Sequence, residues 1–336
     1  MESRQIAVLG AGSWGTAIGK LLADKGHHVR LWARSTERAE AITSAGENAR
    51  YLPGFPLPPT LTATGDLATA LLDASMVVSV IPTHGLRAVL ESAKPMIPAG
   101  VTIVSATKGI EEGTLMLVSN IFESVLPKTM HWQLTYLGGP SFAREVADGI
   151  PTAVCIAGHD RDSVRDAQLT FTTDRFRVYN TEDVVGVELG GALKNVIAIA
   201  AGVADGMGLG HNARAGLITR GLAEISRLAT SMGAHPLTLS GLAGMGDLVL
   251  TCTGDLSRNR QVGIELGQGK TIDEILSSMN MVAEGVRTAK SLYNLCQARG
   301  VEMPISHEVY RILYEGKSPT KALTDLMSRP LRHERE

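Results

Sequence analysis

Residues 10–19 have the sequence GAGSWGTAIG and lie between an apolar run, residues 6–9, and a segment with apolar residues at helical spacing. Gly10, Gly12 and Gly15 form the pattern G-x-G-x-x-G at this expected strand-to-helix turn. Such a turn brings backbone N–H groups and a helix N-terminus against a pyrophosphate. A glycine-rich turn can also serve only to let a helix pack on a strand. The preceding strand and the following helix favour a dinucleotide-binding site.

The composition is that of an ordinary globular protein. The chain has 336 residues, of which 44 % are hydrophobic and 20 % are charged, enough to bury a core in two domains. Its formal net charge of −2 argues against binding to nucleic acid or to an anionic membrane surface, because both need a cationic face. Cys155, Cys252 and Cys296 lie far apart and in no metal-binding spacing. We therefore expect no metal site and a reducing compartment.

The start of the chain carries no targeting pattern. Its first expected strand begins at residue 6, with no cationic leader and apolar segment before it. We also expect no apolar run long enough to span a bilayer. These features together predict a cytoplasmic protein.

The first half of the chain alternates strand-like and helix-like segments. Besides residues 6–9, we expect buried strands at 29–33, 76–81, 101–105, 134–137 and 152–157, a helix at 115–126 and a proline-rich loop at 51–60. This alternation predicts an α/β fold with a largely parallel, Rossmann-like sheet. From residue 181 the pattern becomes helical. We expect a dinucleotide-binding domain, residues 1–185, followed by an all-α domain, residues 186–336.

The position after the second expected strand distinguishes the two nicotinamide dinucleotides. An acidic residue there binds the ribose 2′-hydroxyl of NAD, whereas an arginine accommodates the 2′-phosphate of NADP. The chain has Arg34 and Ser35 at this point and no carboxylate before Glu37. Arg34 could simply end a solvated strand, but its charge favours NADPH, with NAD as the alternative cofactor.

Two further loops follow expected strands and so lie at the carboxyl edge of the sheet, where ligands bind. One carries Lys108, and the other is GGPSFA at residues 138–143. A lysine in a surface turn is ordinarily solvated, and only its position distinguishes Lys108. Ser141 could alternatively cap a helix that has Glu145 in its first turn.

Lys194 is the strongest single candidate for chemistry. Its helical neighbours three and four residues away carry no countercharge. Such a lysine either extends to solvent or points into a pocket, where desolvation would lower its pKa and suit proton exchange with a carbonyl oxygen. Helix context alone favours the solvent-exposed alternative.

A second polar cluster lies between residues 241 and 260. Asp247 follows a glycine-rich stretch and could pair with Lys194. Ser257 is in position to cap a helix whose first turn holds Arg258 and Asn259. Backbone donors, a guanidinium and an amide would then surround a small anion such as phosphate. The alternative is an ordinary capped helix with surface arginines.

Taken together, these segments resemble the NAD(P)-dependent sn-glycerol-3-phosphate dehydrogenases of the bacterial type. The resemblance covers nearly the whole chain and rests on GAGSWGTA (10–17), SATKGIE (105–111), GGPSFAREVADGIPTAV (138–154), ELGGALKNVIAIAAG (188–202), DGMGLGHNARAGLITRGLAEI (205–225), LAGMGDLVLTC (242–252), LSRNR (256–260) and VAEGVRTA (282–289). It implies reversible reduction of dihydroxyacetone phosphate to sn-glycerol 3-phosphate for phospholipid synthesis, with NADP or NAD as cofactor. It also implies a homodimer formed through the helical domain.

The resemblance implies roles for individual residues, with Lys194 as the proton donor and acceptor. Residues expected to contact the cofactor are Gly10, Gly12, Ser13, Trp14, Gly15, Arg34, Lys108, Ala143, Arg258, Val282 and Glu284. Residues expected to hold the substrate are Lys108, Gly139, Ser141, Lys194, Asp247, Ser257, Arg258 and Asn259. Arg34 and Ser141 lie at positions where the family varies.

Two other functions fit parts of the pattern. A 3-hydroxyacid-type dehydrogenase also joins a dinucleotide domain to a helical domain with a catalytic lysine. The cluster at residues 256–260, together with Lys108, favours a phosphate over a carboxylate as the bound anion. A non-catalytic nicotinamide sensor would have no need for Lys194, Asp247 and an anion site together.

Overall fold

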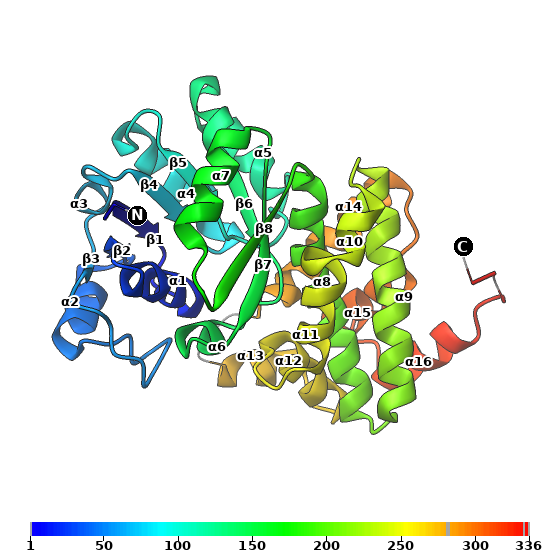
Figure 1. Ribbon diagram of the computed structural model, residues 1–336. Helices are drawn as coiled ribbons and strands as arrows, with labels where there is room; N and C mark the ends of the chain where they lie inside the picture. The colour runs from blue at the N-terminus through cyan, green and yellow to red at the C-terminus, as the bar shows by residue number, and fades with distance from the viewer. Residues whose placement is uncertain (1, 280–282, 332, 335–336) are drawn as a thin grey trace.

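The computed structural model describes residues 2–279, 283–331 and 333–334, and it places a sheet-containing half beside a helical half (Figure 1). Within the described residues, one sheet has the strand order β3-β2-β1-β4-β5-β6-β7-β8. The strands are β1 (Gln5–Leu9), β2 (His28–Trp32), β3 (Leu61–Thr64), β4 (Met76–Ser79), β5 (Thr102–Ser105), β6 (Leu134–Gly138), β7 (Thr152–Gly158) and β8 (Phe176–Thr181). Neighbouring strands are parallel except β6 and β7, which are antiparallel.

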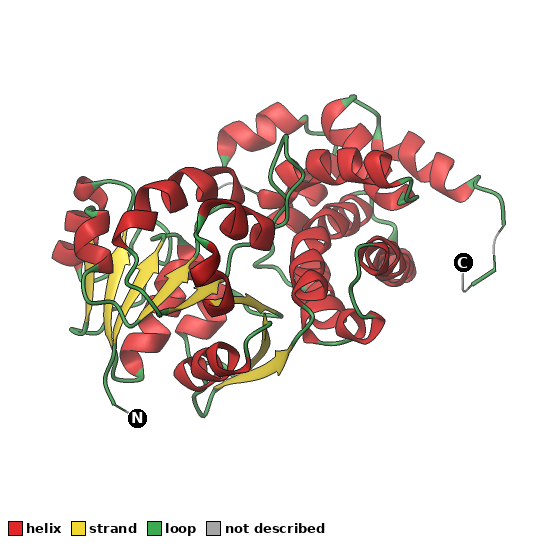
Figure 2. Cartoon of the chain, turned by 90° about the horizontal axis from the view of Figure 1, so that it is seen from above, coloured by secondary structure: helices red, strands yellow, loops and turns green. Residues whose placement is uncertain are grey.

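Helices cover both faces of this sheet, as Figure 2 shows. They are α1 (Ser13–Asp24), α2 (Thr36–Ala45), α3 (Leu67–Leu71), α4 (Thr83–Ala93), α5 (Val118–Val125), α6 (Ala143–Ala147) and α7 (Arg161–Phe171). Because the central strands are covered on both sides, β4 and β5 are buried along their whole length. The predicted α/β fold class and the six predicted strands are confirmed.

Two strands were not predicted, β3 and β8. Both lie at the ends of the strand order and are therefore edge strands. Each carries partly or fully exposed residues, so neither has the continuous apolar run of a strand covered on both faces.

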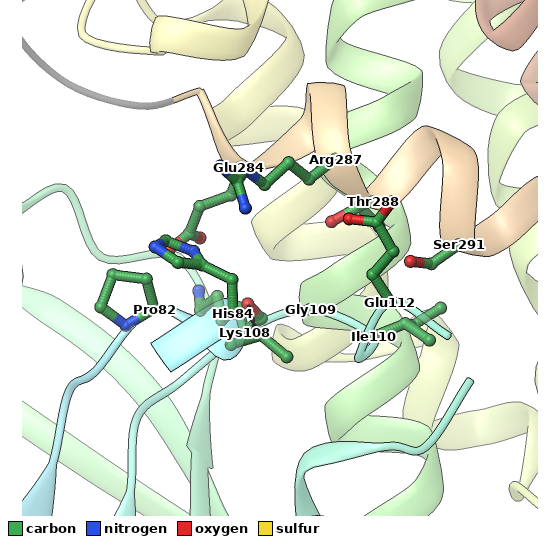
Figure 3. Close-up of a pocket in the computed structure, with 11 residues that line it drawn as sticks. Pro82, His84, Lys108, Gly109, Ile110, Glu112, Glu284, Arg287, Thr288 and Ser291 are labelled. Carbon is green, nitrogen blue, oxygen red and sulfur yellow. Dashed lines mark hydrogen bonds between the residues drawn. The ribbon is translucent and has the colours of Figure 1, made fainter. Parts of the chain in front are cut away.

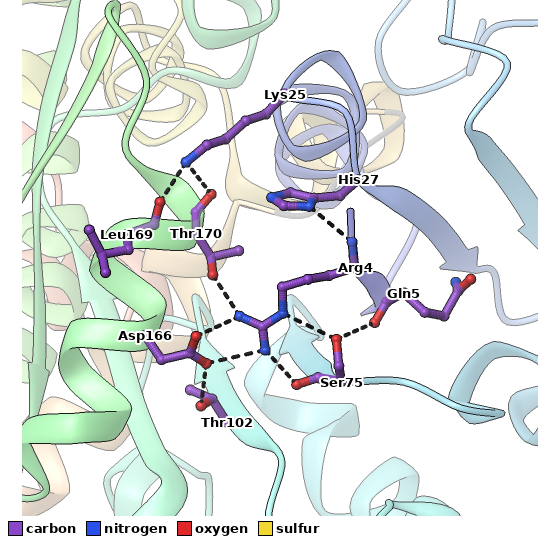
Figure 4. A network of polar contacts seen from close by, with 9 residues as sticks. All are labelled: Arg4, Gln5, Lys25, His27, Ser75, Thr102, Asp166, Leu169 and Thr170. Carbon is purple, nitrogen blue, oxygen red and sulfur yellow. Dashed lines mark hydrogen bonds and ion pairs between the residues drawn. The ribbon is translucent and has the colours of Figure 1, made fainter. Parts of the chain in front are cut away.

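A polar network closes the amino edge of the sheet, opposite the edge where ligands bind (Figure 4). The guanidinium of Arg4, just before β1, donates to Asp166 Oδ1 on α7 at 2.5 Å and to the backbone carbonyl of Ser75, before β4, at 2.8 Å. Thr102, the first residue of β5, donates to Asp166 Oδ2 at 2.7 Å. This network ties α7 to three strands and leaves the carboxyl edge for the site.

The helical half is built around one long helix, α8 (Val184–Gly206), which lies beside the sheet in Figure 1. The helices that follow are α9 (Gly210–Ser231), α10 (Pro236–Ser240), the π-helix η3 (Leu242–Gly246), α11 (Asp247–Thr253), α12 (Arg258–Gly267), α13 (Ile272–Ser278), α14 (Glu284–Arg299), α15 (Pro304–Tyr314) and α16 (Pro319–Met327). Helices α8 and α12 pack closely, because a Cβ added at Gly202 would lie 2.0 Å from the carbonyl oxygen of Arg260. The division into two domains at residue 185 remains a prediction, although the last strand ends at Thr181 and α8 begins at Val184.

Helix α8 corrects one expectation from the sequence. In the part of the chain that the structure describes, it alone is long and apolar enough to cross a membrane, so the prediction that no apolar run reaches that length was wrong. In its most apolar stretch, 94 % of the residues are buried inside the protein. Helices α9, α11, α12 and α14 pack around it, which makes it the core helix of this half.

Candidate active site

The glycine-rich turn joins β1 to α1 at the carboxyl edge of the sheet. Gly10 has φ +121°, and an added Cβ would lie 2.7 Å from the carbonyl oxygen of Val80. A Cβ at Gly15 would lie 1.8 Å from the carbonyl oxygen of Gly10. At Gly12, the N-cap of α1, an added Cβ meets nothing within 4 Å. The outer glycines therefore pack the turn, and the middle one leaves open space at a helix N-terminus, which fits the pyrophosphate of a dinucleotide.

The first turn of α1 is held by the proline-rich loop and by α6. Ser13 Oγ donates to the carbonyl oxygen of Tyr51 at 2.6 Å. Trp14 and Ala143 both pack on the small apolar cluster that contains Phe55. These contacts position the turn, and the roles of these residues toward the cofactor remain predictions.

Arg34 is exposed two residues after the end of β2, at the same edge of the sheet. The neighbouring Ser35 caps α2, because its side chain accepts a hydrogen bond from the backbone N–H of Arg38. Arg34 is therefore held by the backbone at the start of a helix, with its side chain toward solvent. This position suits a 2′-phosphate.

Three side chains meet at one buried carboxylate. Lys194, on α8, donates through Nζ to Asp247 Oδ1 at 2.5 Å and to Thr251 Oγ1 at 2.8 Å. Lys108, in the loop after β5, donates to Asp247 Oδ2 at 2.8 Å. The side chain of Lys194 is 9 % exposed and that of Asp247 is 1 % exposed. Lys194 therefore points into the protein, and the solvent-exposed alternative for this lysine was wrong.

The electrostatics of this cluster follow from its burial and charges. Burial lowers the pKa of Lys194 to about 8; the Asp247 carboxylate acts to raise it and the Lys108 ammonium to lower it. Burial acts to raise the pKa of Asp247, but the two ammonium groups outweigh it and hold that pKa below its usual value. At neutral pH the cluster has two cations and one anion, so it can donate a proton and stabilise a developing negative charge.

Among the described residues, Thr251 is the other hydrogen-bond acceptor of Lys194, and it was not predicted from the sequence. It lies on α11 four residues after Asp247, so the two side chains share a helix face. That spacing is visible in the sequence, but a threonine at this distance from an aspartate is too common to identify alone.

The N-terminus of α12 lies beside this cluster. Ser257 is buried and caps the helix, since its side chain accepts from the backbone N–H of Arg260. Asn259 Oδ1 accepts from the backbone N–H of Gly285 at 2.9 Å, which ties α12 to the start of α14. The guanidinium of Arg260 forms an ion pair with Asp205, with 2.8 Å between Nε and Oδ2. Arg258 is exposed and therefore presents its guanidinium at the surface of this helix end.

Glu284, the first residue of α14, lies near this cluster. Burial raises its pKa, and the positive charges of Arg258, Lys108 and Lys194 act in the opposite direction. The charges from both halves of the chain therefore lie within electrostatic range of one carboxylate. Val282, which was also expected to contact the cofactor, lies outside the described residues.

The loop after β6 supplies the other predicted substrate contacts. Gly139 has φ +122°, and an added Cβ would lie 3.0 Å from Val154 Cα. Ser141 Oγ donates to the carbonyl oxygen of Gly139 at 3.0 Å. The N-cap of α6 is Phe142, with no side-chain hydrogen bond. The alternative role of Ser141 as a helix cap was therefore wrong, and its hydroxyl lies on its own loop at the sheet edge.

A pocket lies between the sheet and the helical half (Figure 3). One wall is formed by residues 82–84 and 108–110, after β4 and β5, together with Glu112. The other wall is formed by Glu284, Arg287, Thr288 and Ser291 on α14. The pocket therefore lies at the carboxyl edge of the sheet, and Lys108 is the member of the lysine cluster that lines it.

Comparison with known proteins agrees with this architecture. Sequence models for the N-terminus and the C-terminus of NAD-dependent glycerol-3-phosphate dehydrogenase match residues 5–164 and 183–324. The chain belongs to this family. It is 55 % identical over 332 residues to the glycerol-3-phosphate dehydrogenase (NAD(P)+) of Citrifermentans bemidjiense, covering 99 % of each chain. The corresponding protein of Leptospira biflexa is 54 % identical over 330 residues, which cover 98 % of this chain and 99 % of that protein.

A solved structure of a family member has the same fold. The crystal structure of glycerol-3-phosphate dehydrogenase from Coxiella burnetii is 41 % identical and superposes with a TM-score of 0.93, covering 97 % of this chain and 99 % of that chain. The family resemblance stated from the motifs is therefore confirmed over nearly the whole chain. This family of oxidoreductases uses NAD or NADP.

Proposed function

We propose that this chain catalyses the reversible reduction of dihydroxyacetone phosphate to sn-glycerol 3-phosphate, with NADPH or NADH as hydride donor. Family membership supports the reaction class. The observation that carries the proposal is the buried Lys194, paired with Asp247 and with a pKa lowered to about 8. A proton donor of this pKa can exchange a proton with a substrate oxygen near neutral pH.

Lys194 would act on the carbonyl oxygen of the substrate, while the bound nicotinamide cofactor supplies the hydride. An ammonium has three N–H donors, and the contacts with Asp247 and Thr251 use two of them. The third can donate to the substrate oxygen, polarise the carbonyl and then transfer its proton. Asp247 and Thr251 fix the direction of that donor.

The phosphate of the substrate would bind at the N-terminus of α12. Arg258 supplies a guanidinium there, and Asn259 supplies an amide whose oxygen already accepts from Gly285. Helix N-terminal N–H groups and a guanidinium together favour a phosphate. Holding the phosphate would fix the distance between the carbonyl group and Lys194, because the substrate is small.

The decisive assay is the oxidation of NADPH in the presence of dihydroxyacetone phosphate, repeated with NADH. We expect turnover with the phosphorylated ketone and much less with dihydroxyacetone. Turnover of a 3-oxo acid in place of dihydroxyacetone phosphate would instead identify a 3-hydroxyacid-type dehydrogenase. No oxidation with any member of a ketone panel would support a nicotinamide sensor.

We further propose that the chain is a cytoplasmic homodimer that supplies sn-glycerol 3-phosphate for phospholipid synthesis. The family resemblance supports the dimer through the helical domain. Cys155, Cys252 and Cys296 are buried free thiols, which supports a reducing compartment. Light scattering of the purified protein should give a mass near twice that of one chain, and a monomer mass would reject the dimer.

A further inference from the structure

Arg287 and His84 approach each other across the pocket between the two halves of the chain (Figure 3). Arg287 lies on α14 of the helical half, one turn after Glu284. His84 lies in the first turn of α4, which follows β4 after a loop of three residues. The pair therefore spans the pocket from the helical half to the loop after β4, the strand that lies next to β1 in the sheet.

Neither Arg287 nor Arg34 has a carboxylate partner of its own in the part of the chain that the structure describes. The pocket contains two carboxylates, and each has another cation near it, although the charge of Arg287 also acts on Glu112. Glu112 accepts from Lys290 Nζ at 2.7 Å. The positive charges of Arg258, Lys108 and Lys194 act to lower the pKa of Glu284. The Arg287 guanidinium is thus available for an anionic ligand.

The sheet topology brings Arg34 toward the same place. Strands β2 and β4 flank β1, so the residues that follow them lie on either side of the glycine-rich turn. Two strand spacings separate these strand ends by about 10 Å. His84 lies within electrostatic range of both arginines. Burial lowers the pKa of His84 most, and the positive charges of Arg287 and, less strongly, of Arg34 lower it further. Positive charges from the two halves of the chain therefore face one imidazole.

We propose that Arg287, with His84 beside it, completes a binding site for the 2′-phosphate of NADP that Arg34 begins. The site rests on the proposed use of a nicotinamide dinucleotide. A phosphate can accept hydrogen bonds from both guanidinium groups and from the imidazole, whereas a ribose 2′-hydroxyl offers one weak acceptor and no charge. Arg287 is therefore a specificity-determining residue that favours NADPH over NADH and that is supplied by the helical half.

The test compares the Arg287→Gln variant with the unaltered chain in two measurements. In the first, kcat/KM is measured for NADPH and for NADH at saturating dihydroxyacetone phosphate. Loss of one charge-assisted contact should lower the NADPH value by about 10- to 100-fold and leave the NADH value within about twofold. The second measurement is calorimetric binding of 2′-AMP and of 5′-AMP, which needs no catalysis. Only the 2′-AMP affinity should fall in the variant.

The matched control is Arg161→Gln, which removes an arginine that is 90 % exposed on α7 and pairs with Glu182. The affinities of this control for 2′-AMP and for 5′-AMP should equal those of the unaltered chain. Equal losses of kcat/KM for NADPH and NADH would mean that Arg287 contacts a part of the cofactor that both dinucleotides share. Unchanged kcat/KM for NADPH would mean that Arg287 does not contact the 2′-phosphate. Either result overturns the proposal. If the chain reduces no dihydroxyacetone phosphate at all, the proposed function fails, and the 2′-AMP measurement still decides the phosphate site.

Discussion

Lys108 Nζ lies 2.8 Å from Asp247 Oδ2, which joins the loop after β5 to the first residue of α11. The other oxygen of the same carboxylate accepts from Lys194. Residues that are 139 and 53 positions from Asp247 in sequence therefore meet on one buried group. The contact makes the surroundings of Lys194, the proposed proton donor, depend on a loop of the sheet half.

Replacing Lys194 with alanine should remove the proton donor without removing the cofactor site. We expect kcat to fall by about 10²- to 10⁴-fold, the usual contribution of a general acid. The dissociation constant for NADPH, measured by fluorescence titration, should change little. A near-normal kcat would reject Lys194 as the proton donor.

The pH profile should reflect the lowered pKa of Lys194, which is about 8. Ketone reduction needs the protonated amine, so kcat/KM for dihydroxyacetone phosphate should fall as the pH rises through about 8. Oxidation of sn-glycerol 3-phosphate needs the neutral amine, so its rate should rise over the same interval. Profiles that bend in the same direction for both reactions would contradict this assignment.

Replacing Asp247 with asparagine should shift the pH profile of ketone reduction to lower pH. The carboxylate acts to raise the pKa of Lys194 against burial and against Lys108. Without it, the inflection of the reduction profile should move below pH 8. The variant should also lose about 3–5 kcal/mol of unfolding free energy, because two buried or partly buried ammonium groups lose their shared partner. Denaturant titration measures this loss.

The matched control for that variant is Asp255→Asn. Asp255 also pairs with a cation, Arg260 at 3.0 Å, but its side chain is 97 % exposed. We expect its stability and its pH profile to equal those of the unaltered chain, since exposed ion pairs contribute little. An unmoved inflection in Asp247→Asn would mean that the carboxylate does not tune Lys194.

Replacing Arg258 with alanine should chiefly raise KM for the phosphorylated substrate. Loss of a charge-assisted contact to phosphate corresponds to about a 10- to 100-fold fall in kcat/KM. Steady-state kinetics with dihydroxyacetone phosphate and with dihydroxyacetone separate the phosphate contact from a general effect. An equal loss for both ketones would remove Arg258 from the phosphate site.

The glycine-rich turn offers a test that separates folding from cofactor binding. Gly12→Ala places a methyl group in open space, so the melting temperature should be unchanged while the dissociation constant for NADH rises. Gly15→Ala forces a Cβ to within 1.8 Å of a carbonyl oxygen, so it should lower the melting temperature. Unchanged NADH affinity in Gly12→Ala would show that the pyrophosphate lies elsewhere.

Much of the fold was predictable because the central strands are covered on both faces. Residues Ile6 to Leu9 are completely buried and form a continuous apolar run in the sequence. The edge strand β3 has the sequence LTAT, in which only Leu61 is buried. A run this short and this polar is indistinguishable from a loop until a neighbouring strand pairs with it. Strand β8 is longer, but only Phe176 and Val178 are buried in it, so it has no continuous apolar run.

The candidate site was predictable in part. Its residue types and their order along the chain were enough to identify the family, because many different motifs of the family occur together in one chain. The environment of Lys194 was not predictable from its helix, which carries no countercharge within one turn. Its partner Asp247 comes from another helix, and its burial comes from the packing of both halves.

The sequence by itself determined the glycine-rich strand-to-helix turn, the alternating first half, the helical second half and the family. These properties depend on spacing and turn chemistry within short segments of chain. Only the tertiary structure decided that Lys194 is buried, that Lys108 and Lys194 share Asp247, and that Arg287 faces His84. Burial and electrostatic partnership arise between residues far apart in sequence, so the pKa of a side chain is a property of the packed molecule.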